Sequence, residues 1–383
     1  MAFGIVCEYN PFHNGHLRQI KEIKKATDEP IICVMSGNFT QRGEIAIVDK
    51  YARAKSALEC GADLVIELPI PFCTSSAEYF ASASIYILAH LGVDKLSFGS
   101  ESGDAEKIIK IAKIAASDEF KEECELLSKE QTSAGAYFEL LANKSGEENI
   151  LSNDILGIEY TKAIIKNSYD MQIFPIKREG NAYRDTQLSL GELPSASAIR
   201  FALSCGNREN IANYVPEQTF KMLEENELAN FERVKDSILF TLRLLNEDTV
   251  DVAISDKGLV NRIITTAHEC TSFDEFESKL QTKKYTKSAI RRAILYILLG
   301  IKQSDLESMP SYTILLGANE KGREYLASIR RSEDAIKVIA KPSDAESNRQ
   351  FELSKKADAL YTMCFEDKKE SGFYIKKSPV III

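Results

Sequence analysis

Two histidines three residues apart lie near the start of the chain, in the segment Asn10-Pro11-Phe12-His13-Asn14-Gly15-His16. The sequence holds only four histidines, so half of them lie here. Histidines with this spacing at the start of a helix project to the same side. A turn rich in Asn, Pro and Gly before a helix also offers bare backbone N–H groups and the positive end of the helix dipole. The segment therefore predicts an anion site for a group that gains negative charge during reaction, above all a phosphate attacked at phosphorus.

Two other interpretations of this histidine pair stay open, a structural helix cap and a metal site. The metal site is the weaker of these, because no cysteine converges on the pair in sequence. The other histidines, His90 and His268, lie far away in apparent helices. We therefore expect no bound metal, and we expect His90 and His268 to be surface residues or satisfied core residues.

A parallel sheet is needed to position the histidine segment. Residues 1–100 alternate short apolar runs with helical periodicity, which predicts the strands Phe3–Cys7, Ile31–Met35, Leu64–Glu67 and Lys95–Phe98 and the helices Leu17–Thr27, Lys50–Cys60 and Ser76–Leu91. Strands separated by helices imply right-handed crossovers, so the expected fold class is α/β with a Rossmann-like parallel sheet. Ligands bind beyond the carboxyl ends of such strands. The polar segments that follow the strands should therefore share one rim: Cys7–Gly15, Ser36–Gly43, Leu68–Pro71 and Gly99–Glu101.

The rest of the chain predicts a second, mainly helical domain. A helix is expected from Ser152 to about Ile165, then a short strand at Met171–Pro175 and a helix start at Pro194–Arg200. Helices dominate from about residue 210, so we place the domains at 1–205 and 206–383. The apolar tail Tyr374–Ile383 should dock onto the body, because an exposed strand of this kind promotes aggregation.

Composition limits the class of protein. The eight cysteines are scattered without a Cys-x-x-Cys pair, which indicates reduced, mostly buried thiols. No basic leader is present, and no run approaches the roughly 20 apolar residues that cross a bilayer. The net charge of −9 argues against a chain coated with nucleic acid but permits one basic face. We expect a cytoplasmic protein without a membrane segment or an obligate protein partner.

One local segment is strongly basic. Residues 277–302 hold seven basic residues against one acidic residue, Glu277. Ile290, Ile294, Ile297 and Leu298 share a helical face, so we expect a docked helix that shows its charges to solvent. The alternative is a solvated helix face with no RNA partner.

Several motifs together resemble one family. Gly4–His16, Ser36–Glu44 and Ala62–Pro69 are similar to bacterial tRNA(Met) cytidine acetate ligases, and the likeness continues through Phe98–Glu101, Ser152–Tyr160 and Lys284–Lys287. The first motif alone indicates only the nucleotidyltransferase superfamily with its His-x-Gly-His signature, which shares its fold with class I aminoacyl-tRNA synthetases. The combination is more specific and covers most of the chain.

The resemblance implies a two-step reaction. Acetate attacks the α-phosphate of ATP to give acetyl-adenylate and pyrophosphate, and the acetyl group then passes to the wobble cytidine of elongator tRNA(Met). It implies ATP with Mg²⁺ carried by the nucleotide, acetate as co-substrate, an ATP-binding domain at 1–205 and a tRNA-binding face in 206–383. Two alternatives remain, a nucleotidyltransferase acting on a small phosphate ester and a non-catalytic nucleotide-sensing RNA-binding protein.

The resemblance also assigns expected site residues. His13 and His16 are the expected catalytic residues, which stabilise charge on the α-phosphate. The expected ATP contacts are Cys7, Glu8, Tyr9, Asn10, Pro11, Phe12, His13, Asn14, Gly15, His16, Leu17, Arg18, Gln19, Ile20, Gly99, Asn153, Arg178, Ser197 and Arg200. The expected tRNA contacts are Lys283, Lys284, Lys287, Arg291 and Arg292.

Individual roles follow from residue type. Gly15 and Gly99 would let the nucleotide approach the backbone, Asn153 would bond the nucleotide through its amide, and Arg178 and Arg200 would bind phosphate oxygens. Structural alternatives remain at three places. Arg178 could pair with Glu179, Ser195 and Ser197 could form a plain helix cap, and Arg42 could pair with Glu44 or Asp49. The segment Ser36–Gly43 could form an acetate pocket or a mobile lid.

Overall fold

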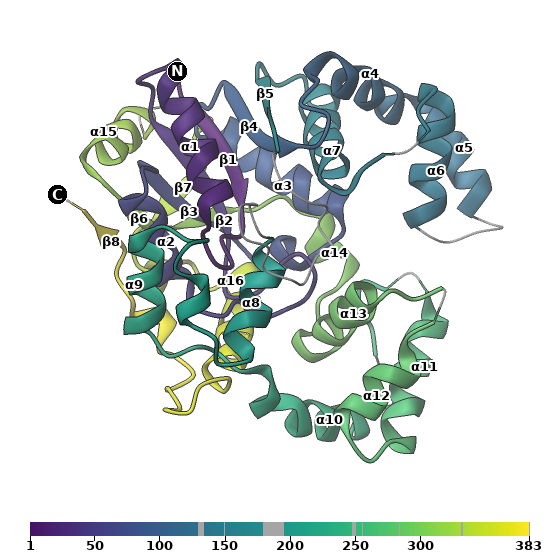
Figure 1. Cartoon of the computed structure of the whole chain (residues 1–383). Coiled ribbons are helices and arrows are strands. Elements are labelled where there is room, and N and C mark those ends of the chain that lie inside the picture. The colour runs from purple at the N-terminus through teal and green to yellow at the C-terminus, as the bar shows by residue number, and fades with distance from the viewer. Residues whose placement is uncertain are drawn as a thin grey trace.

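The centre of the fold is a mixed β-sheet, drawn from a computed structural model in Figure 1. The structure describes residues 1–128, 134–148, 150–178, 195–246, 250–254, 256–282, 284–330 and 332–382. Within these residues the strand order is β5-β4-β1-β2-β3-β6-β7, and β8 also pairs with β6. The strands are β1 Phe3–Cys7, β2 Ile31–Ser36, β3 Leu64–Leu68, β4 Lys95–Ser100, β5 Gln172–Lys177, β6 Tyr312–Ala318, β7 Lys337–Ile339 and β8 Val380–Ile381.

Strand pairing places a reversal of chain order beside β1. β1 lies between β2 and β4 and is parallel to both. β3 continues the sheet on the β2 side and β5 continues it on the β4 side, again in parallel. In open α/β sheets, ligands bind at such a reversal, beyond the carboxyl ends of the strands. The predicted α/β Rossmann-like fold is confirmed, and the histidine segment follows the strand at the reversal.

Helices cover the sheet and form a separate group beyond it. The helices are α1 Asn14–Ala26, α2 Lys50–Glu59, α3 Ala77–Ala89, α4 Ala105–Ala116, α5 Asp118–Ser128, α6 Ala134–Ser145, α7 Ser152–Lys166, α8 Ala196–Ser204, α9 Glu217–Glu225, α10 Lys235–Arg243, α11 Lys257–Glu269, α12 Phe273–Leu280, α13 Lys287–Leu299, α14 Gln303–Glu307, α15 Glu320–Ile329 and α16 Arg349–Thr362. Figure 1 shows α10, α11, α12 and α13 grouped at the lower right, away from the sheet. These four helices share an apolar core of their own, which includes Ile238, Ile263, Phe276 and Ile290.

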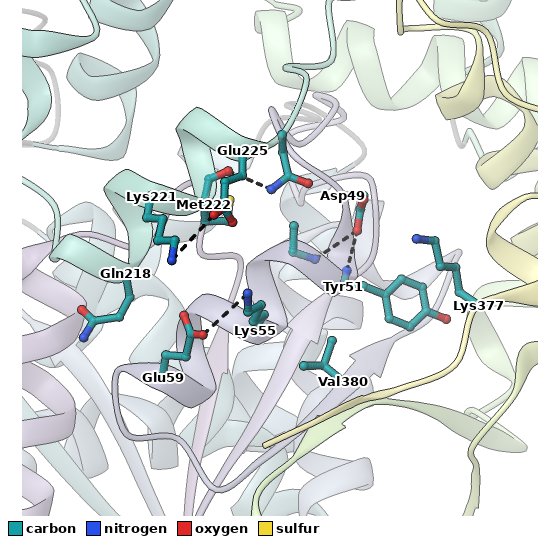
Figure 2. A pocket seen from close by; sticks show the side chains of 12 residues that line it. Asp49, Tyr51, Lys55, Glu59, Gln218, Lys221, Met222, Glu225, Lys377 and Val380 are labelled. Carbon is teal, nitrogen blue, oxygen red and sulfur yellow. Dashed lines mark hydrogen bonds and ion pairs between the residues drawn. The ribbon is translucent and has the colours of Figure 1, made fainter. Parts of the chain in front are cut away.

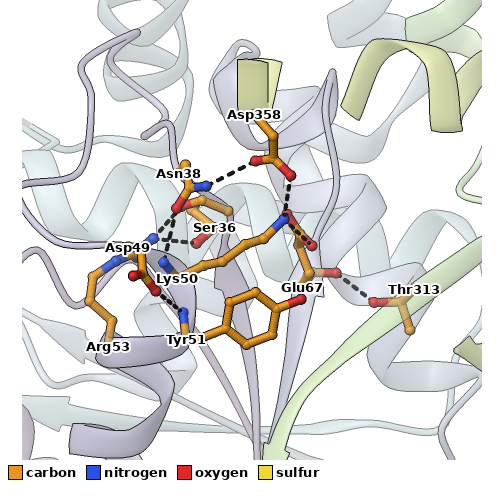
Figure 3. Close-up of polar contacts among 10 residues, drawn as sticks. Ser36, Asn38, Asp49, Lys50, Tyr51, Arg53, Glu67, Thr313 and Asp358 are labelled. Carbon is orange, nitrogen blue, oxygen red and sulfur yellow. Dashed lines mark hydrogen bonds and ion pairs between the residues drawn. The ribbon is translucent and has the colours of Figure 1, made fainter. Parts of the chain in front are cut away.

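A buried ionic cluster ties the end of the chain to the sheet. Lys50 Nζ, at the start of α2, donates to Glu67 Oε1 on β3 at 2.9 Å and to Asp358 Oδ2 on α16 at 3.1 Å, as Figure 3 shows. Asn38 Nδ2 donates to the other oxygen of Asp358 at 2.9 Å. Burial disfavours the charge of Lys50, but Asp358 and Glu67 raise its pKa well above the ordinary value. The cluster therefore joins three segments that are distant in sequence.

The expectation of a mainly helical second domain missed the strands that it contributes. β6 joins β3 in antiparallel orientation, and β7 and β8 join β6 in parallel. All seven residues of β6 are buried. A short, continuous apolar run of this kind cannot be distinguished from a buried helix by its periodicity. The boundary between residues 205 and 206 stays a prediction.

Some predictions involve residues outside the described part of the chain, namely Glu179, Pro194, Lys283 and Ile383. The cysteines are described, and all eight are free. They are mostly buried as expected, although Cys205 is exposed. Among the described helices, none is long and apolar enough to cross a membrane.

Candidate functional site

A cavity of about 460 Å³ lies beyond the carboxyl ends of β1, β4 and β5. The segment after β1, the loop after β2 and the starts of α7 and α8 complete its walls. The residues from the predicted ATP contacts that line it are Cys7, Glu8, Tyr9, Asn10, His13, Gly15, His16, Arg18, Gln19, Gly99, Asn153, Arg178 and Arg200. The tertiary structure therefore brings together segments from five parts of the chain at the reversal between β1 and β4.

His13 and His16 cap the start of α1 reciprocally. His13 is the N-cap residue, and its Nδ1 accepts the N–H of Gly15 at 3.1 Å. The Nδ1 of His16 accepts the N–H of His13 at 3.2 Å. A neutral imidazole whose Nδ1 accepts carries its hydrogen on Nε2. Each ring therefore keeps one Nε2–H donor, which these two bonds do not use.

Both imidazoles are neutral near physiological pH. Burial lowers the pKa of His13 to about 3, and the nearby Arg178 and Arg200 lower it further. Burial also lowers the pKa of His16 well below its ordinary value, with further contributions from His13 and Arg178. The site therefore combines fixed cations with neutral N–H donors, an arrangement that can stabilise a developing negative charge without a proton transfer.

The expectation of bare backbone N–H groups at the start of α1 is wrong. The N–H of Asn14 donates to the carbonyl of Tyr214 at 3.0 Å, and that of Gly15 donates to the His13 ring. The N–H groups of His16 and Leu17 donate to the His13 carbonyl at 2.9 Å and 3.1 Å. Because the chain itself satisfies these groups, the donors toward the cavity come from side chains.

Gly15 has a structural reason to be glycine that the sequence did not suggest. A Cβ at this position would lie 2.8 Å from Cε1 of His13, which is closer than real Cβ contacts. At Gly99, by contrast, a Cβ would meet the Arg178 side chain at an ordinary 3.4 Å. Gly15 therefore leaves room for the histidine ring, in addition to any room for a nucleotide.

Arg178 is held at the cavity by Asn153. Its Nη1 donates to Asn153 Oδ1 at 3.2 Å. The Glu101 carboxylate orients Asn153, because it accepts from Asn153 Nδ2 at 2.6 Å and from the N–H groups of Asn153 and Asp154 at about 3.0 Å. This carboxylate occupies the start of α7, where negative charge is favoured by the helix dipole. The arginine and the amide expected to bind the nucleotide are thus adjacent.

Arg200 reaches the cavity from α8. Its Nη1 donates to the Asn10 carbonyl at 2.9 Å, and its Nη2 donates to Ser197 Oγ at 3.2 Å and to Glu44 Oε2 at 3.3 Å. Ser195 caps α8 by accepting the Ala198 N–H at 3.2 Å, and it also lines the cavity. The helix-cap alternative therefore holds for Ser195, whereas Ser197 is a partner of Arg200 and is not a lining residue.

Other predicted ATP contacts do not line the cavity. Phe12 and Ile20 are buried in the main core, and Leu17 packs against that core. Pro11 is also buried. Asn14 donates through Nδ2 to the carbonyl of Asn213 at 3.0 Å. A continuous run of contacts was expected from 7 to 20, but a helix turns only one of its faces to a ligand.

The loop after β2 forms part of the cavity wall. Thr40, Gln41, Arg42 and Glu44 line the cavity. The N–H of Gln41 donates to Glu8 Oε1 at 2.7 Å, and burial raises the pKa of Glu8. The loop therefore lines the same cavity as the histidine pair, and its expected role as an acetate pocket or lid stays a prediction.

The two suggested carboxylate partners of Arg42 have other contacts. Glu44 pairs with Arg200 and Arg291. Asp49 caps α2 by accepting the N–H groups of Tyr51 and Ala52.

Several lining residues were missed in the sequence. Leu156 and Tyr160 on α7 line the cavity with Asn153. The spacing i, i+3, i+7 from Asn153 could have indicated this shared face. Phe80 and Lys177 also line it, and no sequence signal indicated them.

Comparison with known proteins agrees with this geometry. The sequence matches the HIGH Nucleotidyl Transferase family over residues 1–374. The chain belongs to this family. A tRNA(Met) cytidine acetate ligase from Clostridium perfringens is 34% identical over 398 residues, which cover 99% of this chain and 98% of the relative. The ligase of the same name from Caldanaerobacter subterraneus subsp. tengcongensis is 39% identical, with 96% of each chain covered.

Two solved structures are similar over the full length of both chains. Thermotoga maritima TmcAL in its apo form has 31% sequence identity and a TM-score of 0.90. The same protein bound with alpha-thio ATP has 30% identity and a TM-score of 0.88. Both comparisons cover 100% of each chain, so the structural similarity extends to the late part of this chain, which contains strands β6 to β8.

The predicted basic face is less exposed than the sequence suggested. Lys284 and Lys287 are half exposed and pair with Asp256 at 2.6 Å and with Glu277 at 3.0 Å. Arg291 is only 25% exposed and pairs with Glu44 and Glu277. The expectation that the helix shows its charges to solvent is therefore wrong for Arg291.

Arg292 is also turned inward. Its Nη1 donates to the Gln41 carbonyl at 3.4 Å. Burial lowers the pKa of Arg292. The charge count missed these interactions because Glu44, Gln41 and Asp256 are distant in sequence. Lys284 and Lys287 remain the described basic residues of the expected tRNA set that are open to solvent.

A second cavity, of about 350 Å³, lies between α2, α9 and the chain end near β8. Figure 2 shows two ion pairs at its wall, Lys55–Glu59 on α2 and Lys221–Glu225 on α9, each with a closest approach of 3.7 Å. It shares no lining residue with the histidine cavity. These four charged side chains are paired within their own helices, and Asp49 caps α2, whereas Lys377 also lines this cavity.

Proposed function

We propose that the chain is an ATP-dependent ligase that activates acetate as acetyl-adenylate and transfers the acetyl group to the wobble cytidine of elongator tRNA(Met). Relatives named tRNA(Met) cytidine acetate ligase support this, because they align over nearly all of the chain. Within the molecule, one observation carries the proposal. Two neutral imidazoles, each with an Nε2–H donor, lie beside Arg178 and Arg200 in one cavity.

ATP fits the two chemical halves of this cavity. Its volume of about 460 Å³ lies in the roughly 300–1,000 Å³ range of small-molecule sites. Phe98, Leu156 and Tyr160 supply apolar and aromatic surface for the base, whereas the histidine pair and the two arginines supply partners for the phosphates. The Thermotoga maritima protein bound with alpha-thio ATP supports the same ligand for this site.

The first step is attack of an acetate oxygen on the α-phosphorus. That bond forms as the bond from α-phosphorus to the bridging oxygen breaks, and pyrophosphate leaves with the electron pair. His13 and His16 donate Nε2–H bonds to the α-phosphate oxygens, which gain charge as the bond forms. Arg178 and Arg200 neutralise the phosphates and the departing pyrophosphate. Mg²⁺ carried by the nucleotide would add charge neutralisation.

The second step transfers the acetyl group to RNA. The exocyclic amine of the wobble cytidine attacks the acetyl carbonyl, and AMP leaves as the amine loses a proton. Of the expected tRNA contacts that the structure describes, Lys284 and Lys287 are the ones open to solvent, at and just before the start of α13, and they would contact tRNA phosphates. We place the reaction in the cytoplasm, which agrees with eight free thiols.

The test combines the purified chain with ATP, labelled acetate and elongator tRNA(Met). We expect acetylcytidine at the wobble position, formed with release of pyrophosphate and without acetyl-coenzyme A. Label that never enters tRNA, while ATP demonstrably binds, would contradict the proposal. In a parallel assay, a small phosphate ester replaces acetate and tRNA. Transfer of an adenylyl group to that ester would instead favour a nucleotidyltransferase.

A further inference from the structure

One loop serves both as a wall of the histidine cavity and as the support of α13. Thr40, Gln41, Arg42 and Glu44 line the cavity. On its other side the loop lies directly against α13. Gly43 has a φ of +74°, and a Cβ there would lie 2.8 Å from the backbone nitrogen of Arg292. No side chain fits between them, so a shift of α13 reaches the cavity wall.

The carboxylate of Glu44 is divided between two arginines. Its Oε2 accepts from Arg200 Nη2 at 3.3 Å, and its Oε1 accepts from Arg291 Nη1. Arg291 in turn donates through Nε to Glu277 Oε1 on α12 at 2.8 Å. An alternating chain of charges, Glu277–Arg291–Glu44–Arg200, therefore runs from the separate helical group to the cavity.

The ion pairs of Glu44 with Arg200 and with Arg291 are neither deeply buried nor fully solvated. The side chains of Arg200, Arg291 and Glu44 are 23%, 25% and 30% exposed. At this depth an ion pair is worth little compared with a charge-assisted bond to a phosphate. A polyphosphate in the cavity can therefore displace Glu44 from Arg200, whereas Arg291, the other partner of Glu44, does not line the cavity.

We propose that Glu44 is a positioning residue that couples phosphate binding at Arg200 to the seating of α13. This inference rests on the proposed function, because it takes Arg200 as a ligand of the β- and γ-phosphates. Without nucleotide, Glu44 shares its charge between the two arginines. When phosphate binds Arg200, the carboxylate of Glu44 pairs with Arg291 alone. α13 is then held more tightly on the loop after β2.

The consequence concerns the second substrate. α13 begins at Lys287, close to the half-exposed Lys284, so a firmer seat for α13 also fixes the basic residues that face solvent. Coupling between two binding sites is reciprocal in free energy. RNA bound at the start of α13 should therefore strengthen nucleotide binding through the ion pair of Glu44 with Arg291.

The test is a double-mutant cycle on the affinity for ATP, measured by calorimetry with the full chain. Glu44→Gln removes the competitor of the phosphate and should tighten ATP binding about two- to fivefold, the range expected for one partly exposed ion pair. Arg291→Gln leaves Glu44 entirely to Arg200 and should weaken ATP binding by a similar factor. In the E44Q background, R291Q should have no further effect.

Controls separate this coupling through Glu44, here called the Glu44 relay, from simpler explanations. A long-range loss of positive charge would make R291Q weaken binding equally in both backgrounds, and that result would overturn the proposal. R291K should restore most of the wild-type affinity, since the ion pair to Glu44 is retained. AMP lacks the β- and γ-phosphates, so its affinity should not respond to any of these substitutions. Glu59→Gln removes a matched carboxylate from the Lys55 pair on α2 and should leave ATP affinity unchanged.

The outcome is distinguishable from failure of the proposed function. The cycle needs only ATP binding, so additive effects with intact acetyl transfer would reject the Glu44 relay and leave the function standing. Absence of ATP binding in the wild-type chain would overturn both. Unfolding midpoints of each variant, measured in parallel, show whether the chain is folded. Should R291Q unfold, E44Q alone still tests the proposal, because unchanged or weaker ATP binding by E44Q would overturn it.

Discussion

The imidazole rings of His13 and His16 are stacked, with centroids 3.7 Å apart and planes inclined by 22°. Each ring also accepts one backbone N–H of the first turn of α1. Stacking and capping together fix both rings before any substrate arrives. Donors that are already oriented toward a developing charge need no reorganisation during the reaction, which is the main source of electrostatic catalysis.

The first prediction separates the capping role of His16 from its donor role. His16→Asn keeps an acceptor near the position of Nδ1 for the His13 N–H but removes the Nε2–H donor. We expect acetate-dependent pyrophosphate release to fall by about 10²- to 10³-fold, the usual cost of one such donor, with folding intact. His16→Gln, which can place an amide N–H near Nε2, should lose less. Release at the wild-type rate in H16N would exclude the donor role.

The second prediction concerns stability at mildly acidic pH. The pKa of His13 is about 3 in the folded chain and close to 6.5 when unfolded, so below about pH 6.5 the unfolded state binds the extra proton. The free energy of unfolding should therefore fall as the pH falls, with a contribution from His13 that approaches about 1.4 kcal/mol per pH unit. His13→Asn removes this contribution. The free energy of unfolding of H13N, measured by urea titration at each pH, should therefore decline less steeply as the pH falls. The exposed histidine variant His268→Asn is the control, and parallel curves for H13N and the wild type would contradict the prediction.

The third prediction tests the buried cluster that joins α16 to the sheet. Asp358→Ala removes the buried acceptor of Asn38 Nδ2 and one of the two carboxylates that bind Lys50, while Glu67 remains. We expect a loss of about 1.5–3 kcal/mol in the free energy of unfolding, the usual range for a hydrogen bond to a charged group. The matched control is Glu366→Ala, which breaks an exposed pair with Arg233 and should cost at most about 1 kcal/mol. Chemical denaturation measures both. Equal, small losses would mean that the cluster contributes no more than a surface ion pair.

The fourth prediction addresses the RNA-facing lysines. The double variant Lys284→Gln, Lys287→Gln should weaken tRNA binding and flatten its dependence on salt by about 0.7–0.9 in log–log slope for each phosphate that the variant no longer neutralises. Acetate-dependent pyrophosphate release without tRNA should not change, because neither side chain lines the cavity. As a control, Lys55→Gln, Lys221→Gln removes two partly exposed lysines from the second cavity and should preserve tRNA affinity. Equal salt slopes for the wild type and the K284Q/K287Q variant would place the RNA elsewhere.

Local patterns in the sequence were enough to predict the sheet elements near the start of the chain and to identify the central motif. Alternation of apolar strands with amphipathic helices is a local property, so β1 to β4 and the helices between them were predictable. The strand-then-turn position of His13 and His16 likewise follows from local chemistry. Even here one local detail was wrong, because α1 begins at Asn14 rather than at Leu17, with His13 as its cap.

Which side chains meet depends on how the distant parts of the chain pack together. The late strand β6 enters the sheet beside β3, and Asp358 reaches Lys50, through contacts that no local pattern encodes. The pairing of Glu44 with Arg200 and Arg291 likewise turns part of an apparently solvent-facing basic helix into an internal contact. Charge counts and periodicity describe neighbours along the chain, whereas burial, pKa shifts and ion pairs depend on neighbours in space. The nature of the chemistry was therefore readable from the sequence, but the walls of the site were fixed by packing.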